Sequence, residues 1–307
     1  MMETFIFETE ETDAGLRLDK YLSEKMEGFT RSFLQKLMKD GQITVDEQAA
    51  KAGYRIKPAQ TVKITLPPAI DTEIVPENIP LDILYEDEDL LIVNKPKHMV
   101  VHPSAGHTSG TLVNAVMYHC KESLSGINGE IRPGIVHRID KDTTGSLIVC
   151  KNDESHVCIA EQIKEHSIRR IYRGIVSGNL KEQEGRIEGN IGRHPTDRKK
   201  MAVLSQGGKP AVTHYKVLQQ WNHAAYMEFR LETGRTHQIR VHMASIGHPL
   251  LGDTVYGNAK NPYRLEGQTL HAMTIGLMHP RTQAYLEVSA PLPGYFQSLI
   301  KKLNQNY

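Results

Sequence analysis

The chain has little cysteine, no long apolar run and almost no net charge. Its 307 residues include three cysteines, Cys120, Cys150 and Cys158, which are too few and too widely spaced for a disulfide framework or a zinc site. We expect them to be small buried side chains in a reducing compartment. No apolar run approaches the roughly 20 residues of a membrane span. The acidic N-terminus lacks the apolar segment of a signal peptide, so we expect a soluble, cytoplasmic protein.

The overall composition is that of a globular chain. Hydrophobic residues make up 39% and charged residues 24%, which excludes fibrous and strongly disordered proteins. A chain of this length is expected to form about two domains. The 37 basic and 36 acidic residues leave a net charge of +1, so the total charge gives no sign of a nucleic-acid partner.

The charge is nevertheless uneven along the chain. Residues 14–66 hold ten basic and six acidic residues, and residues 164–200 hold ten basic and five acidic residues. An excess of this kind is typical of a solvated surface or of a surface that contacts phosphates. Charge alone does not decide between the two.

The sequence predicts two domains of different texture. Apolar residues at helical spacing predict helices over 18–26 and 31–39, and alternating residues predict strands at 43–45 and 62–66. Prolines interleaved with acids over 67–80 predict a linker. Beyond it, apolar runs at 90–93, 135–136, 147–150 and 226–231 predict strands, and helices are expected at 111–119, 155–166, 236–246 and 295–303. Scattered helices among strands indicate an α+β domain on a mixed, mainly antiparallel β-sheet flanked by helices and loops.

The first domain resembles the S4 RNA-binding domain. The resemblance rests on Arg17-Leu18-Asp19-Lys20-Tyr21-Leu22, on Thr30-Arg31-Ser32 with Lys36, and on Gly41-Gln42-Ile43-Thr44-Val45. Asp46 and Pro58-Ala59-Gln60 depart from the family pattern. The resemblance implies a small α/β domain over 1–66, with its core at 15–66, whose second helix and following hairpin lie against structured RNA. The RNA-binding candidates here are Arg17, Arg31, Lys36 and Lys39.

The densest polar chemistry lies over 133–145. Its segment His137-Arg138-Ile139-Asp140-Lys141-Asp142 is richer in charge than a turn requires, and loops held by a rigid sheet often carry catalytic groups. A solvated, salt-bridged loop is the alternative on composition. A kinase would need an Asp-Phe-Gly triplet and a Gly-rich loop, and a serine hydrolase would need Gly-x-Ser-x-Gly, and the sequence has none of these. A glycosidase would need two carboxylates on one substrate, which Asp140 and Asp142 do not establish.

Two further segments carry candidate groups. Arg235 stands at a predicted strand-to-helix junction, where an arginine can hold a carboxylate or phosphate by two hydrogen bonds. His237 and His242 are five residues apart, which is unlike a metal pair on a helix. Tyr172 lies on a predicted strand, where core packing is the ordinary use of a tyrosine.

Together these segments resemble the RNA pseudouridine synthases of the large-ribosomal-RNA type that carry an S4 domain. The resemblance covers roughly 15–66 and 81–290 and rests on Gly134–Gly145, on Gly234–His242, and on Asn94-Lys95-Pro96 with Val101-His102-Pro103-Ser104. It implies a catalytic domain over 81–307 that detaches a uracil from its ribose, rotates it and rejoins it through C5.

The resemblance also implies the role of each candidate. Asp140 is the essential carboxylate, which either attacks the sugar or removes a sugar proton to give a glycal. Arg235 is the cation that pairs with Asp140, and Tyr172 stacks on the base and transfers a proton at C5. Arg138 is our candidate for filling the space that the flipped uridine vacates, and His137 is expected to support the loop.

The resemblance requires neither a metal nor an organic cofactor. It implies RNA as the partner, most specifically 23S ribosomal RNA or a large-subunit precursor, and we expect a monomer with no membrane partner. The alternative function is a noncatalytic RNA-binding or ribosome-assembly module in which the second domain has lost activity. The presence of Asp140, Tyr172 and Arg235 argues against it.

Overall fold

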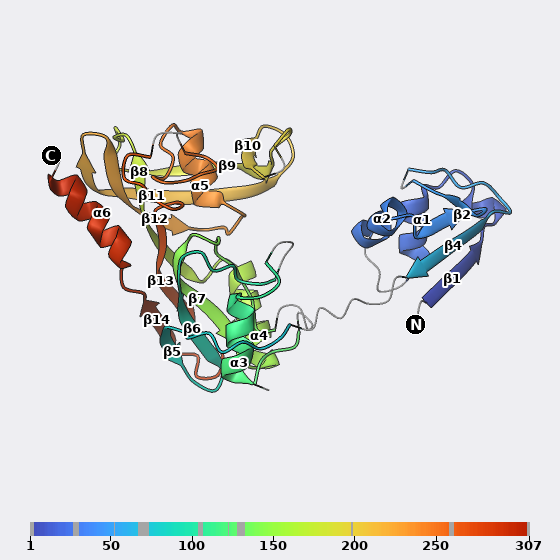
Figure 1. The fold of residues 1–307 in the computed structure, drawn as a ribbon, viewed down its shortest axis with the longest axis horizontal. Helices are drawn as coiled ribbons and strands as arrows, with labels where there is room; N and C mark the ends of the chain where they lie inside the picture. Colours follow the sequence, from blue (N-terminus) through green and yellow to red (C-terminus); the bar gives the residue numbers. More distant parts are fainter. Residues whose placement is uncertain are drawn as a thin grey trace. The chain divides into compact units, whose positions relative to one another are not determined.

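The computed structural model describes residues 3–26, 31–51, 53–66, 74–103, 107–121, 123–127, 133–197, 199–257 and 261–305. The chain divides into two compact units, Met1–Thr72 and Glu73–Tyr307 (Figure 1). Residues 67–73, the first half of the predicted linker, lie outside the described residues, as do Ser104 and Arg198. Within the described ranges, no helix combines the length and the apolar character that a membrane crossing requires.

The first unit packs two helices on a four-stranded sheet. The strand order is β1-β4-β2-β3, and all its pairs are antiparallel. The elements are β1 (Glu3–Glu8), a 3-10 helix η1 (Glu11–Asp13), α1 (Leu18–Lys25), α2 (Arg31–Lys39), β2 (Ile43–Val45), β3 (Gln48–Ala49) and β4 (Thr61–Leu66).

The core of this unit follows the predicted apolar stripes. The buried side chains that were predicted on the two helices are Leu18, Tyr21, Leu22, Met26, Leu34, Leu37 and Met38. They pack on Ile43, Val45, Val62 and Ile64 of the sheet. Phe33, the remaining predicted member, has its side chain outside the described residues. Burial of one face of each helix therefore fixes this unit, as helical periodicity predicts.

The β2–β3 turn explains one departure from the S4 pattern. Asp46 and Glu47 both have positive φ, 48° and 64°. Two such residues form the kind of tight turn that joins antiparallel strands, and Asp tolerates this conformation. The Asp46 carboxylate also accepts hydrogen bonds from the Thr61 backbone N–H at 2.9 Å and from Gln60 Nε2 at 2.7 Å. Gln60 thus ties the hairpin to the start of β4.

The second unit is built on one large mixed sheet. Its strand order is β10-β9-β11-β12-β8-β13-β7-β6-β5, with β14 paired to β13. Among the described strands only β13 and β7 pair in parallel, which confirms a mixed, mainly antiparallel sheet. The strands are β5 (Ile83–Glu86), β6 (Leu90–Lys95), β7 (Thr144–Cys150), β8 (Arg169–Ser177), β9 (Glu184–Arg193), β10 (Met201–Leu204), β11 (Lys209–Trp221), β12 (Ala224–Leu231), β13 (Leu270–Met278) and β14 (Tyr285–Ser289).

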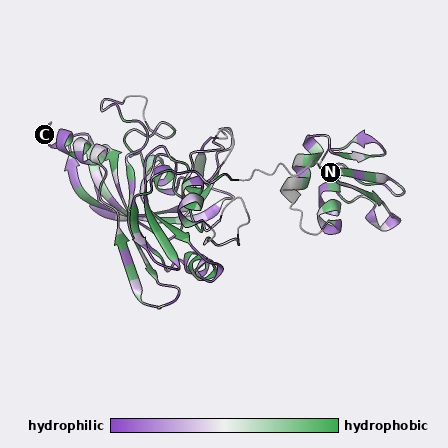
Figure 2. Cartoon of the chain, turned by 60° about the horizontal axis from the view of Figure 1, so that its bottom comes forward, coloured by the Kyte–Doolittle hydropathy of each residue, from purple (hydrophilic) through white to green (hydrophobic). Residues whose placement is uncertain are grey.

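Four helices accompany this sheet, and all four were predicted within a few residues. They are α3 (Leu112–Cys120), α4 (Asp153–Lys164), α5 (Gln238–Ser245) and α6 (Gly294–Gln305). In Figure 1, α3 and α4 lie beside β6 and β7, whereas α6 runs along the other half of the sheet. Hydrophobic residues gather on the strands, whereas the helices carry hydrophobic and hydrophilic residues in alternation (Figure 2). The helix α4 starts two residues early because the Asn152 side chain accepts from the Ser155 N–H.

Two local predictions were wrong. Ile135 and Val136 do not form a strand, since Ile135 makes only an isolated bridge to Val149. The helix predicted over 236–246 spans only Gln238–Ser245, and Ile246 beyond its end is 40% exposed. The backbones of β7 and β13 approach each other so closely at Gly145 that no larger residue fits there. Gly145 has φ +109°, and a Cβ at this position would lie 2.2 Å from the Ala272 carbonyl oxygen. Only glycine permits the parallel β7–β13 contact there.

Candidate active site

Asp140 lies on a loop that β7 and the preceding segment hold in place. The loop leaves the isolated bridge at Ile135, turns at Asp140, where the carbonyl accepts from the Thr143 N–H at 3.1 Å, and enters β7 at Thr144. The side chain of Asp140 is 19% exposed. The backbone of this loop makes few regular hydrogen bonds, so side chains from other parts of the chain hold it in place.

Lys95 is one of those side chains. It is fully buried at the end of β6, and its ammonium donates to the carbonyls of Pro96, Met99 and Lys141 at 2.8, 2.8 and 2.9 Å. Burial lowers the pKa of Lys95 to about 7, although the charges of Asp142 and Asp140 oppose the shift. Because the Lys141 carbonyl follows Asp140 directly, Lys95 anchors the loop next to the carboxylate.

The cation that pairs with Asp140 is Arg240. Its Nη1 donates to Asp140 Oδ2 at 2.8 Å, while Nε and Nη2 donate to the two carboxylate oxygens of Asp253 at 2.7 and 2.9 Å. Burial alone would lower the pKa of Arg240, but hydrogen bonds and charge from Asp253 and Asp140 raise it. The guanidinium is therefore permanently charged and holds Asp140 in one orientation.

Asp253 and Tyr256 hold Arg240 from the other side. Asp253 Oδ1 also accepts the backbone N–H groups of Val255 and Tyr256 at 2.9 and 3.0 Å. The Tyr256 ring lies 5.1 Å from the Arg240 guanidinium carbon, and its hydroxyl is hydrogen-bonded to His237 Nδ1 at 2.8 Å. His237 Nε2 in turn lies 3.8 Å from Asp140 Oδ1. The carboxylate of Asp140 thus faces a rigid, buried network.

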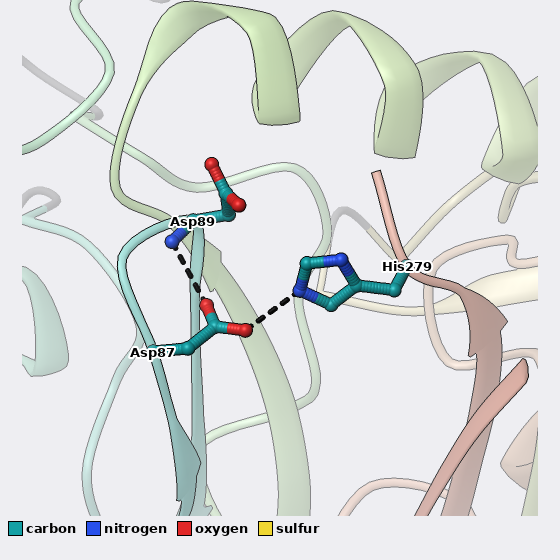
Figure 3. A group of neighbouring side chains, drawn as sticks. All are labelled: Asp87, Asp89 and His279. Atoms are coloured by element: carbon teal, nitrogen blue, oxygen red, sulfur yellow. Dashed lines mark hydrogen bonds and ion pairs between the residues drawn. The ribbon is translucent and has the colours of Figure 1, made fainter. Parts of the chain in front are cut away.

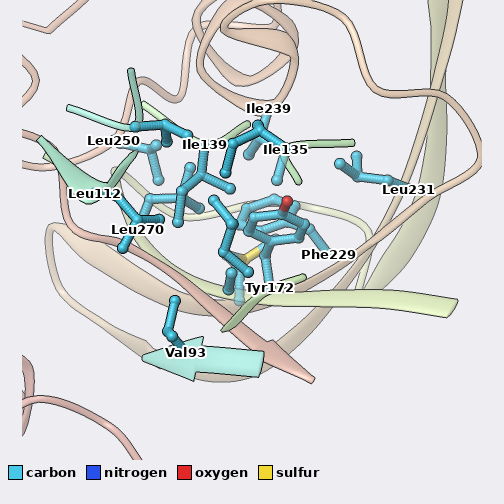
Figure 4. Close-up of a cluster of buried hydrophobic side chains, with 14 of the residues drawn as sticks. Val93, Leu112, Ile135, Ile139, Tyr172, Phe229, Leu231, Ile239, Leu250 and Leu270 are labelled. Carbon is cyan, nitrogen blue, oxygen red and sulfur yellow. The ribbon is translucent and has the colours of Figure 1, made fainter. Parts of the chain in front are cut away.

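A cavity of about 480 Å³ opens beside Asp140. Tyr172, Ile139, Leu231 and Leu270 line it together with polar side chains from the loop and from α5. Figure 4 shows Tyr172 of β8 beside Phe229 of β12, which is its register partner, with Ile139 across from them. Burial raises the pKa of the Tyr172 hydroxyl; the positive charge of Arg170 opposes this shift, and the negative charge of Asp140 adds to it. The cavity therefore offers an apolar aromatic wall next to a carboxylate, which suits a flat, uncharged ring.

His137 supports the loop rather than carrying a proton. Its Nε2 accepts a hydrogen bond from the Ile148 backbone N–H at 2.9 Å, which requires an unprotonated nitrogen. Burial and the nearby charge of Arg170 lower the pKa of His137 to about 3. His242 is also structural, since it is fully buried and Nδ1 is hydrogen-bonded to the Thr213 hydroxyl at 2.9 Å.

The predicted pairing of Arg235 with Asp140 was wrong. Arg235 lines the same cavity, but its Nε donates to the Pro210 carbonyl at 2.9 Å, and Arg240 occupies the place beside the carboxylate. The reason is local, because α5 begins only at Gln238. Arg235 thus stands in the turn before the helix, while Arg240 projects from its first turns. Arg138 is exposed on the cavity rim, 3.4 Å from His102 Nε2.

The predicted RNA contacts of the first unit are only partly described. Lys39 is exposed at the end of α2. Arg17 makes a two-pronged salt bridge to the buried carboxylate of Asp19, at 3.1 Å for each bond. Arg31 and Lys36 lie on α2, but their side chains are outside the described residues.

Sequence reasoning missed Arg240, Asp253, Tyr256 and Lys95. A signal existed for Arg240, because an arginine between Ile239 and Met243 on an amphipathic helix faces toward the core and needs a carboxylate. Nothing in the sequence around Asp253, which lies in the irregular segment after α5, indicated that its carboxylate would bind Arg240.

A second polar cluster offers a metal-like arrangement far from Asp140 in the sequence. Ligand atoms of Asp87, Asp89 and His279 lie within 4.8 Å of one another (Figure 3). Protein donors already hold these atoms, since His279 Nε2 lies 2.6 Å from Asp87 Oδ2 and Arg281 makes a two-pronged bridge to Asp89. The Arg281 bridge lowers the pKa of Asp89 to about 2. We therefore interpret these contacts as structural: they join the β5–β6 turn to the β13–β14 turn.

Comparisons with known proteins agree with this geometry. Residues 89–245 match the family described as RNA pseudouridylate synthase, and residues 16–62 match the S4 domain. The uncharacterized RNA pseudouridine synthase YlyB of Bacillus subtilis is 48% identical over 94% of this chain and 95% of its own length. The ribosomal large subunit pseudouridine synthase D of Zymomonas mobilis is 46% identical over 94% of both chains.

Solved structures show the same fold. Human RNA pseudouridylate synthase domain containing 1 superposes with a TM-score of 0.58 at 24% identity, over 78% of this chain and 98% of that one. Human RNA pseudouridylate synthase domain containing 4 gives 0.56 at 24% identity, over 72% of this chain and 92% of that one. At this identity the likeness supports the fold.

Proposed function

The chain belongs to the RNA pseudouridylate synthase family, and on that premise we propose that it converts specific uridines of large-subunit ribosomal RNA to pseudouridine. The observation that carries the proposal is Asp140, held by Arg240 at the mouth of a cavity with an aromatic wall. The name of the Zymomonas mobilis relative supports the choice of RNA.

Asp140 acts on the ribose of the target nucleotide. Arg240 Nη1 donates to the Asp140 carboxylate at 2.8 Å and holds it in one orientation beside the cavity. The charged carboxylate can attack C1′ or remove a sugar proton to give a glycal, and in either route the bond from C1′ to N1 breaks. Arg240 cannot leave, because Asp253 holds its other two donors.

Tyr172 holds the detached uracil and moves the final proton. After rotation, C5 bonds to C1′ while the bond from C1′ to Asp140 breaks or, in the glycal route, while Asp140 returns the sugar proton. The proton on C5 then leaves, and N1 gains one from solvent. Because burial raises the pKa of Tyr172, its hydroxyl is protonated at neutral pH. It therefore passes on the C5 proton by releasing its own in the same step.

The target uridine reaches the cavity only after it leaves its stack, at a cost of a few kcal/mol. Arg138 on the exposed rim is placed to stabilise the space that the base leaves behind. We assign residues 1–66, the predicted S4-like domain, to binding structured RNA through phosphates, with Arg17, Arg31, Lys36 and Lys39 as its contacts. Since Asp19 holds Arg17, that contact is made through whichever guanidinium donors remain.

The remaining assignments follow from this substrate. We place the catalytic domain at 81–307 and expect it to act as a monomer, since Asp140, Tyr172 and Arg240 of the same chain line the cavity together. With a ribosomal RNA substrate, we expect the enzyme to work in the cytoplasm, where ribosomes assemble. The mass of the protein in solution tests the monomer.

The deciding experiment maps pseudouridines in ribosomal RNA. RNA from a strain that lacks this protein is incubated with wild-type protein or with Asp140→Asn, which keeps the side-chain shape but removes the charge. We expect wild type to form pseudouridine at defined positions and the variant to slow by at least about 1,000-fold, as removal of an essential catalytic group does.

Two results would contradict the proposal. If wild type binds the RNA but forms no pseudouridine, the noncatalytic RNA-binding module becomes the better interpretation. If Asp140→Asn forms as much as wild type, the chemistry lies elsewhere in the cavity.

A further inference from the structure

The cavity beside Asp140 contains more positive charge than the proposed base chemistry uses. Its basic side chains are Arg138, Lys164, Arg170, Arg235 and Arg240, while Asp140 is the single acidic residue of its lining. Arg240 pairs with both Asp140 and Asp253, and this group of three has a net charge of −1. Among the residues that the structure describes, the other four basic side chains make no ion pair, so the cavity keeps an excess of positive charge.

Arg170 is the most unusual of these cations, because it is only 7% exposed. Its Nη2 donates to the Glu232 carbonyl at 3.1 Å, and its Nε is buried without an acceptor. Gly234 leaves room for the guanidinium, since a Cβ at that position would lie 2.7 Å from Nη1. Arg170 therefore occupies a recess of the cavity wall that its guanidinium fills closely, and its buried Nε–H group has no acceptor.

The surroundings of Arg170 are positive or neutral. Burial lowers the pKa of Arg170; the nearby Tyr172 hydroxyl opposes this shift, and the charge of Arg235 adds to it. The nearby His137 is neutral, because its Nε2 accepts a backbone hydrogen bond. A buried cation without a counter-ion destabilises the folded protein, and an apolar side chain of similar size would fit the recess better. The recess is consequently built for an anion that arrives with the substrate.

We propose that Arg170, with Arg235 beside it, binds a backbone phosphate that flanks the target uridine. This inference rests on the proposed function, and it adds a recognition group for the RNA backbone inside the catalytic cavity. A phosphodiester carries a full negative charge and two free oxygens, which match the fork of a guanidinium. A uracil carbonyl carries no net charge and would leave two neighbouring guanidinium groups uncompensated.

The position of Arg170 along β8 fits this role. Arg170 and Tyr172 are two residues apart on one strand, so their side chains point to the same face, about 7 Å apart at the Cα atoms. A base that stacks on Tyr172 brings its own flanking phosphates toward that face. Arg170 would then fix the depth at which the flipped nucleotide sits.

The experiment uses a ribosomal RNA fragment that contains a uridine converted by the wild type. Single-turnover rates are measured against protein concentration at several KCl concentrations for wild type, Arg170→Gln and Arg170→Lys. Arg169→Gln is the matched control, because Arg169 is exposed and its Nη1 pairs with Glu287 at 2.9 Å. The rates give the half-saturating concentration, the maximal rate and the dependence of affinity on salt.

We expect Arg170→Gln to raise the half-saturating concentration at least tenfold at about 0.1 M KCl. The slope of log affinity against log salt should fall by about 0.7, the value for one contact to a single-stranded phosphate. Arg170→Lys should keep the slope, and Arg169→Gln should change the affinity less than twofold. An unchanged slope in folded Arg170→Gln, checked by circular dichroism, overturns the phosphate site.

A change in the RNA alone tests the same contact without relying on the fold of a variant. A single methylphosphonate linkage, placed 5′ or 3′ to the target uridine, removes one phosphate charge. One of the two linkages should weaken binding to the wild type about tenfold and leave binding to Arg170→Gln unchanged. If neither weakens the wild type, the proposal fails.

A base contact would give a different pattern. Replacement of the target by 4-thiouridine would then weaken the wild type and not Arg170→Gln, which would also overturn the phosphate assignment. If the wild type forms no pseudouridine in any ribosomal RNA, the proposed function fails. Suppose instead that pseudouridine forms, that Arg170→Gln leaves the salt slope unchanged and that neither methylphosphonate linkage weakens binding to the wild type. Then the proposed function stands and only the proposed phosphate site is wrong.

Discussion

Arg240 donates a hydrogen bond to Asp140 across one hundred residues of sequence, at 2.8 Å from Nη1 to Oδ2. The same guanidinium makes two hydrogen bonds to Asp253, so it joins the catalytic loop, α5 and the loop after it. The carboxylate that we propose as catalytic is therefore held by residues far from its own loop.

Arg240→Lys should lower the maximal single-turnover rate about 100-fold, since a lysine cannot hold both carboxylates in a planar fork. Arg235→Lys is the matched change in the same segment, and it should lower the maximal rate much less than Arg240→Lys, because its proposed phosphate contact acts in binding. Arg169→Lys, at an exposed position paired with Glu287, is the control that should leave the maximal rate within a few fold. A larger loss in Arg235→Lys than in Arg240→Lys would make Arg235 the catalytic cation after all. Thermal unfolding of both variants separates loss of fold from loss of chemistry.

Tyr172→Phe should lower the maximal rate by about 100-fold or more, because it removes the proton-transferring hydroxyl and keeps the ring. The half-saturating RNA concentration should stay near that of wild type. Tyr172→Leu should impair both, since it also removes the stacking surface. Because burial raises the pKa of Tyr172 above its usual value of 10, its ionisation should produce no fall in rate below pH 10. Equal rates in wild type and Tyr172→Phe would exclude the hydroxyl from the chemistry.

Lys95 should make folding stability depend on pH. Its pKa is about 7 in the folded protein against an ordinary value of 10.5, so between these values the unfolded chain binds more protons than the folded one. Stability from this group therefore rises with pH, by up to about 1.4 kcal/mol per unit, from about pH 7 toward 10.5.

Urea unfolding at about pH 7, 8 and 9 tests this. The free energy of unfolding of wild type relative to Lys95→Met should increase across the series, whereas the difference from Lys301→Met, an exposed control on α6, should stay constant. A flat difference for Lys95→Met would mean that Lys95 stays charged throughout. The same variant should also have a lower maximal rate, because the Lys141 carbonyl loses its anchor.

Arg31→Glu combined with Lys36→Glu should weaken binding to ribosomal RNA and flatten its salt dependence. The slope should become smaller by about 1 to 2, because each phosphate that the protein no longer neutralises reduces it by a little less than one. The double variant Lys51→Glu with Lys57→Glu makes the same charge change on exposed positions outside α2. Fluorescence anisotropy at several salt concentrations compares the two. If both pairs weaken binding equally, net charge rather than the α2 face governs binding.

The sequence by itself determined the elements and the chemistry on the catalytic loop. Helical spacing placed Leu18, Leu22, Leu34 and Leu37 in one core, because burial of one face of a helix is a local pattern. The polar segment around Asp140 stood out because a turn does not need so many charged groups.

Only the tertiary structure decided which residues meet Asp140. Arg235 and Arg240 lie five residues apart in one segment, and the choice between them depends on where α5 begins and on the position of Asp253. Lys95 and Arg170 likewise stand out only because the structure buries them. Burial of a charged group costs desolvation free energy, and the sequence does not show which charged residues are buried. Pairing across a sheet and burial of charge are set by distant parts of the chain, so local patterns cannot determine them.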